Sequence, residues 1–232
     1  MSVRSAECLL PIVAQHFNIR SVADFGCGRG GWLAAWKGLG VETVQGFDGD
    51  YLRYQTLLIE DSEMQFGDLC QPVALGRQFD LVQSLEVAEH LPKSAAKTFI
   101  ETLTRHGDLV LFSAATPGQG GMSHINEQPF SYWRKHFDSV GFVPLDCVRP
   151  TIQARHHIEI WYRYNTLIYV EKERLATLAP EVRAMAIKAN QAIPDFSSRL
   201  YRTRKLLIRP LPVFVVNWLS SLKAKCHMKL PR

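Results

Sequence analysis

Residues 21–32 read SVADFGCGRGGW, which is typical of a buried strand, a glycine turn and the start of a helix. The run before the glycines is short and apolar, with a single acid, Asp24. Gly26, Gly28 and Gly30 follow at alternating positions, and residues without a side chain let the backbone turn tightly and approach a ligand closely. A helix that begins just after them would point its unpaired N–H groups at the same place. The stretch therefore predicts a nucleotide-type cofactor site.

Strand and helix signals alternate from this stretch to about residue 115. Strand-like runs lie at 43–48, 64–68, 79–84 and 108–113, and helical patterns lie at 31–37, 51–58 and 95–106. Strands that alternate with helices indicate an α/β fold with a doubly wound, mostly parallel sheet.

Two further β-rich runs, 142–148 and 161–170, are too close together for a crossover helix. We therefore expect them to form a terminal antiparallel strand pair. The composition changes after Lys172, so we expect one domain at 1–172 and a basic helical C-terminal extension at 173–232.

Composition restricts the class of protein. The chain has 232 residues, 47% of them hydrophobic, which is enough for one sizeable core. Its five cysteines are scattered without a Cys-x-x-Cys pair, which suits neither a disulfide framework nor a zinc cluster. The first residues show no charged-then-apolar targeting signal. We expect a cytoplasmic protein.

The positive charge is concentrated in the extension. Nine of the 27 Lys and Arg residues, and no acid, lie in 196–232, so the rest of the chain is mildly acidic. The segment 206–222, LLIRPLPVFVVNWLSSL, is too short and too broken for a confident membrane span. A helix from Pro212 would have an apolar side and could lie on an anionic membrane, at its inner face. It could equally pack on the domain or on a second subunit, and the basic residues could hold RNA phosphates.

The glycine loop fits two cofactors. Its Gly-x-Gly-x-x-Gly spacing, with Asp48 after the second strand, matches a dinucleotide site. However, Asp24, Asp48 and Asp68 fall in or at the ends of three successive strands. Three acids suit a cofactor with an ammonium group, a ribose and an adenine better than a phosphate-rich one, and S-adenosylmethionine (SAM) is such a molecule.

The chain resembles the class I SAM-dependent methyltransferases in four motifs: DFGCGRG (24–30), FD (47–48), GDL (67–69) and FDLVQSLEVAEHL (79–91). The resemblance covers about residues 20–170 and implies a Rossmann-like fold, SAM as cofactor and methyl transfer as activity. It implies that the glycine loop lines the methionine part, that Asp48 binds the ribose and that Asp68 lies near the adenine. The full set that we expect to bind SAM is Asp24, Gly26, Gly28, Gly30, Asp48, Asp68, Leu69 and Leu85.

A second motif suggests a metal. In one helical turn Glu86, Glu89 and His90 would share a face. Two carboxylates and an imidazole could hold Mg²⁺ or Mn²⁺, which would acidify an acceptor hydroxyl. The Glu-x-x-Glu-His pattern resembles that of small-RNA 2′-O-methyltransferases and ubiquinone-pathway O-methyltransferases, where a downstream histidine completes the site, and His124 is the best match. The Glu–His pair could instead only cap a helix or contact the cofactor.

His124 and Glu127 are the catalytic candidates. A hydroxyl acceptor must lose its proton, so His124 would serve as base or as metal ligand, and Glu127 would orient a neighbour. The Asn/Asp-Pro-Pro-Tyr/Phe motif of amino-group methyltransferases is absent after the fourth strand, where Ser84, Leu85 and Glu86 stand.

The sequence thus predicts a methyltransferase that acts on a hydroxyl of a sugar, glycan, lipid-linked or other small-molecule acceptor. An RNA ribose 2′-O-methyltransferase is the first alternative. A non-catalytic SAM-binding or membrane-scaffold module and a nicotinamide oxidoreductase are the others.

Overall fold

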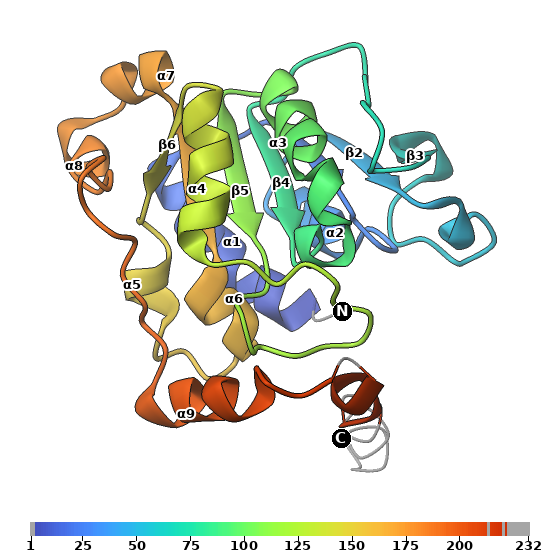
Figure 1. Ribbon diagram of the computed structural model, residues 1–232. Helices are drawn as coiled ribbons and strands as arrows, with labels where there is room; N and C mark the ends of the chain where they lie inside the picture. Colours follow the sequence, from blue (N-terminus) through green and yellow to red (C-terminus); the bar gives the residue numbers. More distant parts are fainter. Residues whose placement is uncertain (1–2, 213, 220, 222–232) are drawn as a thin grey trace.

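The computed structural model describes residues 3–212, 214–219 and 221. Its centre is a seven-stranded sheet in the order β3-β2-β1-β4-β5-β7-β6 (Figure 1). Strands β1 to β5 pair in parallel, and β7 runs antiparallel to both β5 and β6. The strands are β1 Ser21–Phe25, β2 Thr43–Asp48, β3 Met64–Phe66, β4 Leu81–Leu85, β5 Leu109–Ser113, β6 Phe142–Leu145 and β7 Leu167–Glu171. The expected doubly wound fold and its terminal antiparallel pair are confirmed.

Helices cover both faces of the sheet, so β1, β4 and β5 are buried along their whole length. Such strands read as continuous apolar runs rather than as alternating ones. In Figure 1, α3 and α4 lie in front of the sheet and α1 and α2 lie behind it. These helices are α1 Val3–His16, α2 Gly31–Gly38, α3 Ala96–Arg105 and α4 Phe130–Ser139.

The predictions for two elements, a helix and a strand, are wrong. The helix expected at 51–58 is only a 3-10 turn, Asp50–Leu52, because the chain then runs along the glycine loop, where the Leu58 N–H donates to the Arg29 carbonyl. The strand expected at 161–170 begins only at β7, and the residues before it form the short helix α6, Ile160–Asn165. Aromatic residues favour strands, but tertiary packing overrides that preference here. Tyr162 packs edge-on against Trp32, with ring centroids 5.0 Å apart.

The C-terminal extension turns back beneath the carboxyl ends of the central strands (Figure 1). It contains the helices α7 Lys172–Thr177, α8 Pro180–Arg183 and α9 Arg199–Ile208, and residues 214–219 are also helical. The buried Arg149, in the short helix α5 Arg149–Ile152, ties the extension to the domain by donating to the carbonyls of Tyr164 and Pro194 at 3.1 and 3.0 Å.

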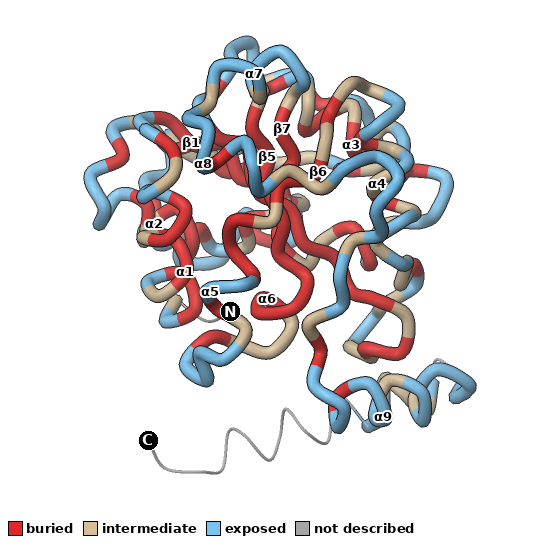
Figure 2. Tube along the Cα trace, turned by 90° about the vertical axis from the view of Figure 1, so that its left-hand side faces the viewer, coloured by how far each residue is buried: buried red, intermediate tan, exposed pale blue. Residues whose placement is uncertain are grey.

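The outer side of the extension is open to solvent. Figure 2 shows α9 mostly exposed, and the side chains of Leu207, Phe214 and Trp218 are 70%, 74% and 60% exposed. Among the described residues, no helix combines the length and the apolar character that crossing a bilayer requires. The expectations for Leu222 and the basic residues after it fall outside the described part of the chain.

Candidate active site

The glycine loop joins β1 to α2 and has the expected backbone conformation. Gly26, Gly28 and Gly30 have φ values of +86°, +56° and +83°, which side chains rarely tolerate. A Cβ atom at Gly26 would lie 2.3 Å from the Val87 side chain, so this glycine also lets the loop pack on the segment after β4.

Asp48, at the end of β2, faces the glycine loop. One carboxylate oxygen accepts from the Gly28 N–H at 2.7 Å, and the other accepts from the Gly49 N–H and the Tyr51 hydroxyl, both at 2.6 Å. The Tyr51 side chain is mostly exposed, so it is free to leave when another hydroxyl takes its place. A ribose diol is a ligand of that kind.

A cavity of about 650 Å³ lies over these residues, at the carboxyl ends of β1, β2 and β4. Asp68 is exposed at its edge, and hydrogen bonding by the Cys70 backbone N–H lowers the pKa of the Asp68 carboxyl. The cavity is large enough for a nucleoside cofactor. The predicted residues that line it are Gly26, Gly28, Asp48, Asp68, Leu69, Glu86 and His90.

Asp24, which we expected to hold the cofactor's ammonium group, does not line this cavity. Its side chain is buried and accepts from Gln83 Nε2 at 2.7 Å, and Trp36 Nε1 donates to the same glutamine at 2.8 Å. Burial, with a smaller contribution from the Asp48 carboxylate, raises the pKa of Asp24 to about 7 even though the Gln83 hydrogen bond lowers it. The structure therefore places Asp24 behind the glycine loop, as a structural group.

Two other predicted cofactor residues also lie outside the cavity lining. A Cβ atom at Gly30 would lie 2.8 Å from the Ile59 side chain, so this glycine serves the packing of the loop. Leu85 is buried at the end of β4 and belongs to the apolar core.

Glu86 departs from the expected helical turn. Its φ is +57°, and only Ala88–His90 form a 3-10 turn after it. Its carboxylate accepts from Gln119 Nε2 at 2.6 Å and from Asn165 Nδ2 at 3.1 Å. Glu86 is therefore not part of the three-residue ligand cluster that its motif suggested. Neither amide partner could be found from the sequence, because Asn165 reaches the site from α6, 79 residues further along the chain.

Glu89, His90 and His124 do come together. Their candidate ligand atoms lie within 4.8 Å of one another, and the two imidazole rings meet edge to face with centroids 4.9 Å apart. Glu89 is fully buried, and neither oxygen of its carboxylate has a hydrogen-bond partner within the described part of the chain. Burial, and then the neighbouring Glu86 carboxylate, raise the pKa of Glu89 well above its usual value. A buried acid without a partner is costly, so the site calls for a proton or a cation.

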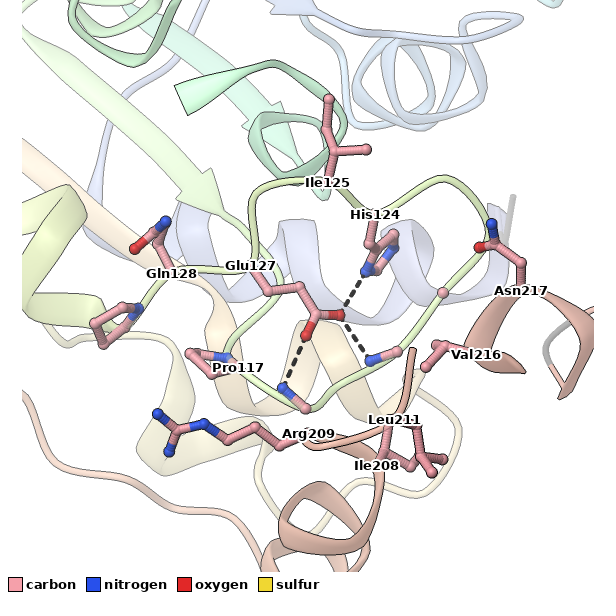
Figure 3. Close-up of a pocket in the computed structure, with 14 residues that line it drawn as sticks. Pro117, His124, Ile125, Glu127, Gln128, Ile208, Arg209, Leu211, Val216 and Asn217 are labelled. Carbon is pink, nitrogen blue, oxygen red and sulfur yellow. Dashed lines mark hydrogen bonds and ion pairs between the residues drawn. The ribbon is translucent and has the colours of Figure 1, made fainter. Parts of the chain in front are cut away.

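Glu127 holds His124 in place (Figure 3). Its carboxylate lies 2.8 Å from His124 Nδ1 and accepts from the backbone N–H groups of Gly118 and Gly120 at 2.8 and 2.7 Å. Although burial alone would raise the pKa of Glu127, these hydrogen bonds lower it. An ionised Glu127 assigns the proton to Nδ1, which leaves the lone pair of His124 on Nε2, 4.0 Å from Glu89.

The chain is similar to known proteins in sequence and in fold. No protein-family model matches the chain. A tRNA U34 carboxymethyltransferase of Azotobacter vinelandii is 26% identical over 216 residues, which cover 88% of this chain and 64% of that protein. The chain thus spans slightly less than two thirds of the length of this curated relative.

Three solved structures share the fold with a TM-score of 0.53 each. They are DesVI of Streptomyces venezuelae (13% identical, covering 73% of this chain and 91% of that one), the sugar N-methyltransferase KedS8 of Streptoalloteichus sp. ATCC 53650 (14%, 72% and 87%) and the methyltransferase domain of bacterial CtHen1-C (16%, 73% and 99%). By its strand order and these likenesses, the chain has the fold of these proteins, and its glycine loop resembles that of the class I SAM-dependent methyltransferases, the family whose cofactor is S-adenosylmethionine.

Proposed function

We propose that the protein transfers the methyl group of SAM to a hydroxyl of a sugar, glycan, lipid-linked or other small-molecule acceptor. The observation that carries this proposal is the oriented His124–Glu127 pair beside the cofactor cavity, because a hydroxyl acceptor needs a group that takes its proton. An amine acceptor, by contrast, has a lone pair available once it is neutral.

In this proposal two groups of residues in the cofactor cavity have different roles. Gly28, Asp48 and Asp68 bind the amino-acid part, the ribose and the adenine. Glu86 and His90 also line the cavity, the His90 ring lies 4.9 Å from that of His124, and the sulfonium methyl points toward them. The enzyme supplies alignment of oxygen, methyl and sulfur, which contributes much of the rate of such a displacement.

The reaction is a single displacement. The acceptor oxygen forms a bond to the methyl carbon, and the carbon–sulfur bond breaks with its electron pair staying on sulfur. The hydroxyl proton passes to Nε2 of His124, and the charge that develops on the imidazole is stabilised through Nδ1 by Glu127.

The residues also fit a divalent cation. Glu89, His90 and His124 would hold it, and the two unpartnered oxygens of Glu89 are the observation that supports the fit. Bound there, Mg²⁺ or Mn²⁺ would supply charge that lowers the pKa of the acceptor hydroxyl. His124 Nε2 would then be a ligand, and Glu127 would orient that ligand rather than a base.

An RNA ribose 2′-hydroxyl is the second candidate acceptor. The curated relative is named as a tRNA enzyme, and α9, whose Arg204 donates to the Gln119 carbonyl, also carries the exposed basic residues Arg199 and Arg202. Binding of RNA through these residues would weaken steeply with salt.

The test combines binding with turnover. Calorimetry should detect binding of SAM and of S-adenosylhomocysteine, and label from radioactive SAM should enter a hydroxylated lipid, glycan or RNA fraction of a cell extract. His124→Asn should lose about 100-fold or more of the rate and keep cofactor binding, whereas His157→Asn, an exposed histidine, should change neither.

Each outcome has a distinct meaning. Activity that resists EDTA assigns His124 as the base, and activity that EDTA abolishes and Mg²⁺ or Mn²⁺ restores assigns it as a ligand. Cofactor binding without any labelled product contradicts the proposal and favours a non-catalytic module.

A further inference from the structure

A second cavity, of about 440 Å³, is lined by His124 and Glu127 (Figure 3). One wall is the loop 117–121 together with His124 and Glu127. The other wall comes from the C-terminal extension, whose lining residues are Ile208, Arg209, Leu211, Val216 and Asn217.

The two cavities meet at the histidine pair. His90 and Ser123 line the cofactor cavity, and His124 lines the second one. The His90 and His124 rings are 4.9 Å apart, and His90 Nδ1 lies 3.2 Å from the Ser123 carbonyl oxygen. A molecule in the second cavity would therefore place its reactive group at the boundary where the methyl group arrives.

The extension is fitted closely to the loop. A Cβ atom at Gly118 would lie 2.2 Å from the Lys205 carbonyl oxygen, and one at Gly120 would lie 3.2 Å from the Val216 side chain. Both glycines have positive φ, +81° and +68°. Glycines at these positions permit an approach that a side chain would block.

Polar contacts hold the same arrangement. Arg204 Nη1 donates to the Gln119 carbonyl at 2.8 Å, and the Ser123 N–H donates to Asn217 Oδ1 at 3.1 Å. The loop that receives these contacts is the one whose amides bind Glu127. The extension thus supports the loop that positions the reactive histidine.

The lining indicates the chemistry of the ligand. Ile208, Leu211 and Val216 present an apolar wall opposite His124. Arg209 lies at the edge, and its guanidinium has no ion pair or hydrogen bond with any described residue. A free guanidinium favours a carboxylate or phosphate group.

We propose that this second cavity is the acceptor site and that the C-terminal extension is its outer wall. This proposal rests on the methyltransferase function above. The acceptor would carry an apolar part against Ile208 and Val216, a hydroxyl at His124 and an anionic group at Arg209. This assigns the basic extension a role in acceptor recognition.

The probe is 8-hydroxyoctyl phosphate, which combines an alkyl chain, a hydroxyl and an anion, and its neutral control is 1,8-octanediol. Calorimetry with S-adenosylhomocysteine present should show that the phosphate binds the wild type more tightly than the diol does. Arg209→Gln should remove that preference. Ile208→Trp fills the cavity and should weaken binding about tenfold or more, and the matched control Leu207→Trp, on the exposed side of α9, should not.

Phosphatidylglycerol vesicles form the second arm, because their headgroup presents hydroxyls beside a phosphate. Binding of the soluble probe assigns a free acceptor. Binding of vesicles alone assigns a lipid-borne acceptor, provided that Ile208→Trp abolishes this binding and Leu207→Trp does not. Binding of neither, or equal effects of the two Trp variants, overturns the proposal. Binding of S-adenosylhomocysteine is measured separately, so its absence would refute the methyltransferase function while the probe still tests the cavity.

Discussion

Replacing Asp24 by asparagine tests whether this carboxylate is a structural group or a ligand of the cofactor. The side chain is 3% exposed and accepts a hydrogen bond from Gln83. The fold, mainly through burial, raises the pKa of Asp24 to about 7, whereas in the unfolded chain an aspartate has a pKa of about 3.9. The amide oxygen of the substituted side chain can accept the same hydrogen bond, but the amide cannot ionise.

The sign of the effect follows from the raised pKa. Between pH 4 and 7 the folded protein holds a proton that the unfolded chain has released, so the stabilising contribution of Asp24 is complete below about pH 4 and is lost as the pH rises to 7. The part of this contribution that is lost between pH 5 and pH 8 equals about two pKa units. At 1.36 kcal/mol per unit, that is about 3 kcal/mol of stability. The new amide N–H₂ costs about 1–3 kcal/mol if it is unpaired, but it costs the same at every pH.

The assay is urea unfolding of the wild type and Asp24→Asn at pH 5 and pH 8, with cofactor affinity measured by calorimetry. Between the two pH values the stability of the variant relative to the wild type should rise by about 3 kcal/mol. SAM affinity should change by less than about threefold, or about 0.7 kcal/mol. Asp61→Asn, at an exposed position, is the control for the substitution itself.

Two results would refute this reasoning. Parallel stability curves for Asp24→Asn and the wild type would mean that the fold does not favour the protonated acid. A loss of SAM affinity beyond about tenfold, or 1.4 kcal/mol, in a well-folded variant would restore the ammonium-binding role expected from the sequence.

Three further predictions concern the cofactor cavity and the ligand cluster. Gly26→Ala should lower stability and SAM affinity more than Gly40→Ala does, because both have positive φ but only the first meets a neighbouring side chain, that of Val87; equal thermal shifts and equal affinities in calorimetry would contradict this. Tyr51→Phe removes the hydroxyl that donates to Asp48, the acid that we propose binds the ribose, so SAM should bind about two- to tenfold more tightly. Weaker binding in calorimetry would show that the hydroxyl contacts the cofactor. In EDTA at pH 8, Glu89→Gln should melt at a higher temperature than the wild type, because the fold raises the pKa of this buried acid and so disfavours its charge. Added Mn²⁺ should raise the melting temperature of the wild type only. An equal rise in both proteins would exclude Glu89 as a ligand.

The fold and the cofactor loop follow from local patterns along the chain. Alternating apolar strands and helices predict a doubly wound, mostly parallel sheet. Because parallel strands end at one edge, Asp48 and Asp68 were expected near the glycine loop, and they line the same cavity as Gly26 and Gly28. The conformation of Gly26 and Gly28 follows from the same short stretch, because residue type and spacing there determine the backbone directly.

Partners that are distant in the chain could not be predicted in this way. Asp24 and Gln83 pair because β1 and β4 are neighbours and bring these two residues opposite each other, and the acid does not line the cavity. Glu86 was expected on one face of a helical turn with Glu89 and His90, but its backbone is left-handed and its carboxylate accepts a hydrogen bond from Asn165 of α6. A one-residue difference in local conformation redirects a side chain, and it is packing between distant segments that selects the conformation.

The amino-acid order alone thus predicts a SAM-type α/β domain with a candidate catalytic histidine, His124, after β5. The cavity that His124 lines, and the residues on its opposite wall, depend on long-range contacts. Gly118 and Gly120 accept the returning chain from α9 to Asn217 because they have no side chain, and this contact creates a walled cavity from two segments separated by about ninety residues. Such a cavity is a property of the packed molecule, since neither segment carries a sign of the other.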